Sequence, residues 1–362
     1  MPEPTKHILV AVLDWGLGHA TRCVPLIKFL LDRGCNVSLA GSGDSLLLLK
    51  QEFPHLQAFE IVSYKVAYAE TIPFMVKIFM QLPKFLAAIK NEHQQIERLC
   101  LEKKMDAIIS DNRYGCWSNS IPSVLITHQL NLLLPPAFKW LNGFVNFLNH
   151  KLIKKFDTCW VPDYPGNTLT RALTKPGNLR VSFIGMLSRM KPGKIAPTEN
   201  TILAIVSGPE PQRQILEDIL AKEMSNRREA CTLVRGQPGV RTNLHRDGLT
   251  LYDHLPGERL SELIQQSSLV IARSGYSTIM DFARIGVKKV ILIPTPGQTE
   301  QEYLARELDK QKIALCQAQA DFDLTDALSR LSDYNGFKEK EAEPGLLAKA
   351  LEDLLQMNKH GL

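Results

Sequence analysis

The sequence predicts an α/β protein of two domains, each built on a parallel sheet covered by helices. Short runs of aliphatic and β-branched residues alternate with longer amphipathic segments, which is the pattern of βαβ units. The length of 362 residues accommodates two domains of ordinary size. Hydrophobic residues make up 44% and charged residues 22%, which excludes a disordered, collagen-like or coiled-coil chain.

The N-terminal half opens with an apolar run, HILVAVL at residues 7–13, that predicts a buried strand. The loop DWGLGH (14–19) follows, then a helical pattern over 21–32 that Gly34 ends, and a second strand at 35–41. The same apolar pattern predicts further strands at residues 106–111, 123–129, 158–163 and 180–185.

A segment rich in Pro, Gly and Lys divides the chain, and the strand and helix alternation restarts after it. We expect an N-terminal domain over 1–185, a linker over 186–199 and a C-terminal domain over 200–344. An amphipathic helix is expected within 345–362.

Charge and cysteine content restrict the partners and the compartment. The net charge of +5 is low for a nucleic-acid-binding protein and suits phosphate ligands or an anionic membrane surface. Seven irregularly spaced cysteines without a CxxC pair indicate a reducing compartment and no zinc site. The N-terminus lacks a signal-peptide layout, so we expect a cytoplasmic protein that at most lies on a membrane.

The first loop carries candidate catalytic residues. Gly16 and Gly18 allow close approach of a ligand, and His19 at the start of the helix is a candidate general base. Asp111 ends a later strand of the same sheet, where a carboxylate would fix the tautomer of His19. The alternative roles are a capping or loop histidine for His19 and a helix cap for Asp111.

Three further polar residues are candidates for acceptor binding at this edge. Arg22, one turn after His19, would hold a phosphate or carboxylate. His128 and Gln129 follow the strand at 123–129. Structural hydrogen bonding is the alternative role for each.

The pattern of residues 272–305 indicates a nucleotide-binding site. The loop Arg273-Ser274-Gly275 leads into a helix at Ser277-Thr278, which suits a diphosphate. Asp281 is placed to bind ribose hydroxyls, or else it complements the helix dipole. Gln298 and Gln301 follow the next strand, where they would bind sugar hydroxyls or lie in a solvated loop.

This stretch resembles the donor-binding signature of GT-B glycosyltransferases. It is most similar to the branch of the lipid-linked peptidoglycan N-acetylglucosaminyltransferase. GLGHATR resembles the acceptor-side loop of the same enzymes, and His19 and Asp111 match the catalytic pair of the UDP-dependent glycosyltransferases. The resemblance also implies phosphate contact at Ser207-Gly208 and uracil contact at the backbone of Leu255. Asp14-Trp15, Ser207-Gly208-Pro209 and the aspartate at position 281 depart from that branch and place the chain outside the peptidoglycan enzyme itself.

The resemblance implies two Rossmann-like domains facing across a cleft, with the C-terminal helix packing back on the first. It implies an inverting hexosyltransferase that needs neither metal nor cofactor. The partners would be a UDP-sugar donor and a hydroxyl acceptor, either a sugar or a lipid-linked cell-envelope glycan, and no nucleic acid.

Two alternatives remain open. Nucleotide-sugar hydrolases of this fold also carry G-x-G-H-x-x-R, and in them the histidine would activate water. A non-catalytic nucleotide-sugar-binding protein would keep the fold without turnover.

Two acid-free stretches, 72–90 and 135–156, mix aromatic residues with lysines. Basic amphipathic helices of this kind suit the anionic inner face of a cytoplasmic membrane. Packing against the first sheet is the alternative interpretation.

Overall fold

The computed structural model describes residues 5–64, 74–166, 169–193, 195–237, 243–246, 248–341 and 343–357. The chain divides into two compact units. Residues 1–187 together with 342–362 form the first unit, and residues 188–341 form the second. The first unit is therefore discontinuous in sequence.

The first unit contains a seven-stranded parallel sheet with the order β3-β2-β1-β4-β5-β6-β7. The strand order reverses between β1 and β4, as in doubly wound nucleotide-binding folds. Its strands are β1 (His7–Val12), β2 (Asn36–Gly41), β3 (Gln57–Glu60), β4 (Ala107–Asp111), β5 (Ser123–Ile126), β6 (Thr158–Val161) and β7 (Val181–Phe183).

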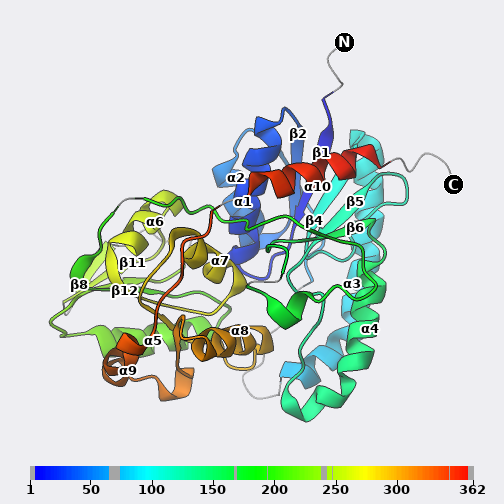
Figure 1. Cartoon of the computed structure of the whole chain (residues 1–362). Coiled ribbons are helices and arrows are strands. Elements are labelled where there is room, and N and C mark those ends of the chain that lie inside the picture. The colour runs from blue at the N-terminus through cyan, green and yellow to red at the C-terminus, as the bar shows by residue number, and fades with distance from the viewer. Residues whose placement is uncertain are drawn as a thin grey trace. The chain divides into compact units, whose positions relative to one another are not determined.

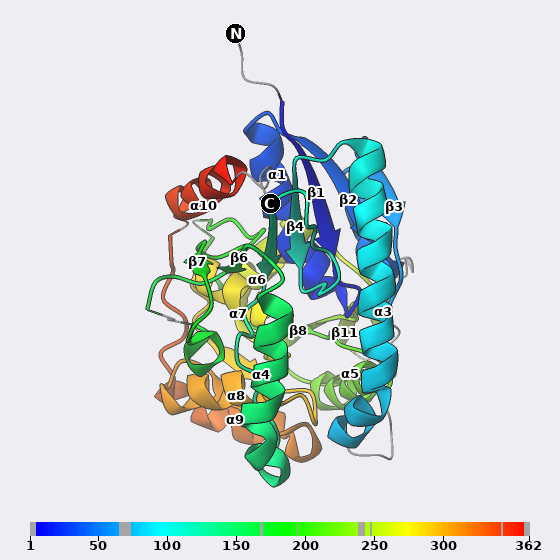
Figure 2. The same cartoon turned by 90° about the vertical axis from the view of Figure 1, so that its right-hand side faces the viewer.

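Helices cover both faces of this sheet because its strands are apolar on both sides. Ile8, Val10 and Val12 of β1 join one core with helices α1 (Leu17–Asp32), α2 (Gly43–Glu52) and α10 (Pro344–Gln356). Leu9 and Ala11 point to the other face, against α3 (Phe74–Lys103). Figure 1 shows α10 in red lying over the N-terminal unit, and Figure 2 shows α3 running along the opposite face.

The second unit repeats this architecture, with the order β10-β11-β9-β8-β12-β13-β14. All pairs are parallel except β10 with β11. Its strands are β8 (Thr198–Ile205), β9 (Ala230–Val234), β10 (Asn243–Arg246), β11 (Leu249–Tyr252), β12 (Ser267–Ala272), β13 (Val290–Leu292) and β14 (Leu315–Cys316). Its helices include α5 (Gln212–Met224), α6 (Gly257–Gln266), α7 (Tyr276–Ile285), α8 (Thr299–Lys310) and α9 (Leu324–Arg330). The predicted α/β fold of two units is confirmed.

The segment expected to be a linker packs on the second unit. The backbone N–H of Gly193 donates to Gln265 Oε1 at 2.6 Å, and Ser188 binds Asp281. Strand β8 begins at Thr198, within the expected linker. A Pro- and Gly-rich composition signals irregular backbone, but it does not exclude specific contacts.

Candidate functional site

Strands β1 and β4 lie side by side where the order of the first sheet reverses, and their carboxyl ends carry the candidate catalytic pair. Gly16, with φ of 90°, turns the chain from β1 into α1, so that His19 lies in the first turn of the helix. Asp111 is the last residue of β4 and pairs in register with Val12 of β1. In such sheets ligands bind at this reversal point.

Four side chains form one hydrogen-bonded chain there. His19 Nδ1 lies 2.5 Å from Asp111 Oδ1. Arg22 donates to both oxygens of Asp111, from Nε at 2.5 Å and from Nη2 at 2.6 Å. Arg22 Nη1 lies 3.1 Å from His128 Nδ1. Asp111 is fully buried, whereas the side chain of His19 remains 15% exposed.

The negative charge of Asp111, which Arg22 stabilises, determines which nitrogen of His19 carries the proton. Burial raises the pKa of Asp111, but Arg22 and His19 outweigh it and hold that pKa well below its usual range. Two groups contact His19 Nδ1: Asp111 Oδ1 at 2.5 Å and Arg22 Nη2 at 3.0 Å. The ionised carboxylate only accepts hydrogen bonds and makes the shorter contact, so we assign the proton of the neutral imidazole to Nδ1, which leaves Nε2 without one. Burial, helped by the charge of Arg22, lowers the pKa of His19 below 6.5. His19 is therefore neutral at pH 7 and can accept a proton at Nε2.

The structure corrects the expectation that Arg22 holds a substrate anion. Its guanidinium is 2% exposed and is engaged by Asp111 and His128. A buried arginine beside a buried carboxylate stays with its counter-charge, because separating the pair would leave both desolvated. Arg22 thus positions Asp111, and His128 in turn contacts Arg22. The backbone N–H of Gln129 donates to Thr127 Oγ1, at the same strand end.

A second set of candidates follows strands β8 and β12, where the order of the second sheet reverses. Ser207 and Gly208 come after β8, and Gly208 has a φ of 113° that favours glycine. Arg273, Ser274 and Gly275 come after β12, and α7 begins directly behind Gly275 with no acidic residue in its first turn. Ser277 and Thr278 lie in that turn, where the helix dipole favours an anion.

Hydrogen bonds of the Arg273 guanidinium hold this loop in place, and they direct its charge towards other parts of the unit. Its side chain donates to the carbonyls of Ile293, Pro294 and Gln212 and, at 2.6 Å, to Gln319 Oε1. Burial lowers the pKa of Arg273 to about 10. The expected direct contact of Arg273 with a diphosphate is corrected accordingly, because the carbonyls already hold its guanidinium.

Ser274 and the two glutamines are also internally paired. Ser274 Oγ donates to the carbonyl of Gln301 at 2.8 Å. Gln301 accepts from the N–H of Thr295 at 3.0 Å and donates to Gln298 Oε1 at 2.5 Å. The loop after β13 is thereby tied to the loop after β12. Leu255 is buried between β11 and α6.

Asp281 has a partner that sequence reasoning missed. Ser188 Oγ donates to Asp281 Oδ1 at 2.5 Å. Burial raises the pKa of Asp281 to about 6, against the opposing effects of Ser188 and Arg189. Ser188 was hidden because it lies in the segment that composition marked as a linker.

We expect nucleoside binding to weaken as the pH falls through about 6, because protonation removes an acceptor for ribose hydroxyls. The free energy of unfolding changes in the opposite direction and rises as the pH falls. The ordinary pKa of 3.8 lies below the folded value, so protonation of Asp281 stabilises the fold as the pH falls from 7 towards 4. Uridine is the proper probe, since a terminal phosphate titrates near pH 6 itself. Calorimetry should show this dependence for the wild type and a flat, weaker profile for Asp281→Asn. A pH-independent wild-type affinity would exclude Asp281 from the ribose site.

Among the residues that the structure describes, no group of three His, Cys, Asp or Glu side chains is arranged to hold a metal ion. In the sequence Asp321-Phe322-Asp323, Asp323 caps α9 by accepting from the N–H groups of Thr325 and Asp326. All seven cysteines are unpaired.

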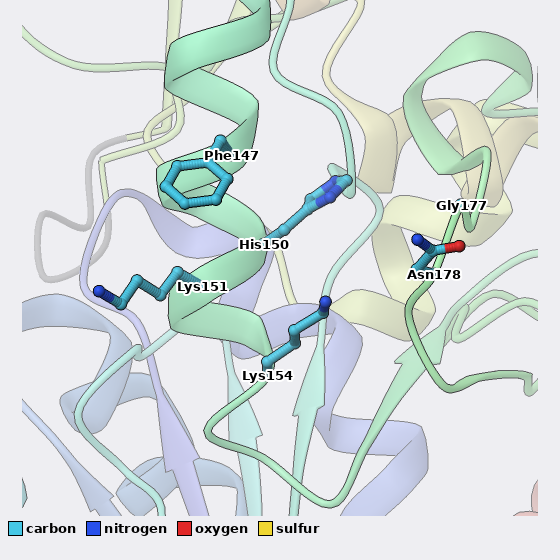
Figure 3. A pocket seen from close by; sticks show the side chains of 6 residues that line it. All are labelled: Phe147, His150, Lys151, Lys154, Gly177 and Asn178. Carbon is cyan, nitrogen blue, oxygen red and sulfur yellow. The ribbon is translucent and has the colours of Figure 1, made fainter.

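A basic and aromatic surface covers the 3-10 helix Pro136–Leu141 and α4 (Asn142–Ile153) of the first unit. Trp140, Phe144 and Phe147 are 78%, 56% and 64% exposed. Beside them is a hollow of about 590 Å³ lined by Phe147, His150, Lys151, Lys154, Gly177 and Asn178. Figure 3 shows His150 and Lys154 directed towards Asn178, with Phe147 and Lys151 on the other side of the helix. We call this surface the α4 surface. In the other acid-free stretch, the side chains up to residue 82 lie outside the described residues.

Known proteins share both sequence and fold with this chain. Residues 252–354 match the glycosyltransferase family 28 C-terminal domain. An uncharacterized glycosyltransferase of Methanosarcina acetivorans is 26% identical over 84% of this chain and 83% of its own length. The UDP-N-acetylglucosamine--N-acetylmuramyl-(pentapeptide) pyrophosphoryl-undecaprenol N-acetylglucosamine transferase of Lactobacillus johnsonii is 24% identical over 69% of this chain and 68% of its own. The crystal structure of the glycotransferase of kitacinnamycin superposes with a TM-score of 0.62 at 16% identity, covering 98% of this chain and 95% of that one.

These matches and the two α/β units define a glycosyltransferase of the GT-B fold. Within that class, the chain resembles the branch of the lipid-linked peptidoglycan N-acetylglucosaminyltransferase and the UDP-glycosyltransferases.

Proposed function

We propose that this glycosyltransferase is an inverting, metal-independent enzyme that moves a hexose from a UDP-sugar to a hydroxyl acceptor. The supporting observation is the orientation of His19, whose Nδ1 is bound by Asp111 while Nε2 keeps its lone pair. A neutral imidazole held in this way is suited to take a proton from a hydroxyl.

In the proposed reaction, His19 removes the proton of the acceptor hydroxyl as its oxygen attacks the anomeric carbon. The bond from that carbon to the diphosphate oxygen breaks on the opposite face. The proton resides on Nε2, and Asp111 stabilises the imidazolium. The N-terminus of α7 and the loop before it stabilise the departing diphosphate, with no cofactor.

The donor assignment is tested by thermal unfolding with UDP, TDP, GDP and several UDP-sugars in EDTA. At a hundred times its dissociation constant, a ligand of the folded state stabilises by about 2.7 kcal/mol. We expect a selective rise in the unfolding temperature with UDP and one UDP-sugar. Absence of a shift with every nucleotide would overturn the donor site.

An assay of UDP release with the purified protein distinguishes sugar transfer from hydrolysis. With the selected UDP-sugar, we expect UDP release to rise when acceptor glycosides are added, with a glycoside product of inverted configuration. Release of free sugar at a rate independent of every acceptor would instead identify a nucleotide-sugar hydrolase. Binding without release of UDP under either condition would identify a binding protein.

We further propose that the acceptor is lipid-linked and that the α4 surface contacts an anionic membrane. The relative from Lactobacillus johnsonii acts, by its name, on an undecaprenol-linked acceptor. Exposed Trp140, Phe144 and Phe147 beside Lys151 and Lys154 combine apolar insertion with positive charge. In the described part of the chain, no helix has the length and apolarity that a membrane span requires.

Sedimentation with phosphatidylglycerol vesicles tests this contact. We expect salt-sensitive binding that neutral phosphatidylcholine vesicles do not support, since each lysine near an anionic surface contributes about 1 kcal/mol. The double variant Trp140→Ser/Phe147→Ser should lose most of the binding. Leu101→Ser is the matched control, because Leu101 is 69% exposed on α3 and is not part of the α4 surface. Equal binding of the two variants would exclude the α4 surface.

A further inference from the structure

The loop that carries His19 also carries a tryptophan that the proposed chemistry does not use. Trp15 is 42% exposed and lies four residues before His19. An indole that stays partly exposed gives up part of the free energy of apolar burial. Tryptophan is also enriched at binding interfaces.

Other rings support Trp15 from behind. Its ring centroid lies 6.3 Å from that of Tyr64 at an interplanar angle of 73°, and 6.3 Å from that of Phe85 at 40°. Tyr64 and Phe85 are 5.0 Å apart, edge to face. Tyr64 is only 7% exposed. The indole therefore rests on a packed aromatic base while part of its surface faces solvent.

A buried ion pair holds this base in place. The hydroxyl of Tyr64 donates to Glu92, and Arg113 Nε donates to Glu92 at 2.5 Å. The backbone N–H of Gly115 donates to the same carboxylate at 2.8 Å. Glu92 and Arg113 are fully buried, so this network is rigid and fixes Tyr64 under the indole.

Hydrogen bonds also hold the residue that precedes Trp15. Asp14 accepts hydrogen bonds from Ser42, at 2.8 Å, and from Ser63. These contacts fix the backbone position from which Trp15 extends. On the other side the loop continues to the imidazole of His19.

We infer that Trp15 is the platform for the acceptor of the proposed reaction, and that the acceptor presents a sugar ring to it. A pyranose has an apolar face of C–H groups, which matches the exposed part of an indole held on a rigid aromatic base. Stacking there holds a ring hydroxyl towards Nε2 of His19. The inference rests on the proposed function for the identity of the site.

Binding without donor tests this inference apart from turnover. The probes are the methyl glycosides of glucose, galactose, mannose and N-acetylglucosamine, followed by saturation-transfer NMR on the full chain. We expect Trp15→Ala to weaken the best glycoside roughly tenfold and Trp15→Phe to restore most of the affinity. Leu47→Ala is the control, because Leu47 is 49% exposed on α2 of the same unit and should bind like wild type.

Three results overturn the inference. One is that no glycoside binds the wild type at millimolar concentration, and another is that Trp15→Ala binds as tightly as wild type. The third is that methylcyclohexane competes as well as the glycosides, which would make the indole part of a purely apolar site. Failure of the transferase proposal is recognised separately, from glycoside binding that persists with no transfer from any UDP-sugar.

Discussion

Replacing His19 by alanine should lower kcat for sugar transfer by roughly a thousandfold, the scale of general-base catalysis. In the proposed reaction Nε2 of His19 receives the acceptor proton, since Nδ1 is bound to Asp111 at 2.5 Å. The nucleotide affinity should remain unchanged, because the residues proposed to bind the donor nucleotide belong to the second unit. Steady-state kinetics and calorimetry with UDP measure the two quantities.

The matched control is His55→Ala, an exposed histidine of the same unit. It should retain wild-type kinetics. Full activity of His19→Ala would remove His19 as the base. A parallel loss of UDP affinity would indicate a folding defect and leave the catalytic assignment unsupported.

Asp111→Asn should destabilise the protein by about 3–5 kcal/mol, the cost of breaking a buried ion pair on one side. The variant keeps the shape of the side chain but leaves the buried charge of Arg22 without its counter-charge. Because the folded pKa of Asp111 is depressed, its contribution is complete at pH 7 and declines as the pH falls from its ordinary pKa of 3.8 through that lower folded value. Urea unfolding at pH 7 measures the change.

Glu352→Gln provides the control for this prediction. Glu352 pairs with Arg33 at 3.7 Å, with side chains 63% and 46% exposed, so its loss should change stability by less than about 1 kcal/mol. If Asp111→Asn were no more destabilising than Glu352→Gln, the buried pair would not be a stabilising element. Transfer activity should also fall in Asp111→Asn, because the tautomer of His19 is no longer fixed.

Much of the fold was predictable because local pattern and global topology agree. The strand HILVAVL, the loop at Gly16 and the helix after it appear as β1, the turn and α1. Parallel strands buried on both faces leave a clear apolar signature, and their carboxyl ends share one edge. The proximity of His19 and Asp111 follows from that rule.

The roles of the arginines could not be read from the sequence. Arg22 lies in the N-terminal half of α1 and Arg273 in the loop after β12, both positions that suit anions, yet Asp111 holds the first and main-chain carbonyls hold the second. The sequence gives the position of each arginine along the chain, but the groups that its side chain binds come from segments many residues away. Ser188 escaped notice for the same reason, since its contact with Asp281 spans 93 positions.

The helix α10 has a consequence for how the chain is made. Its residues Leu347, Ala350, Leu351 and Leu354 close a core whose other buried members all lie before residue 188. A ribosome therefore completes the second unit before it releases the residues that seal the first. We expect the nascent first unit to expose an apolar face throughout synthesis of residues 188–341. During that time a chaperone can bind the exposed face.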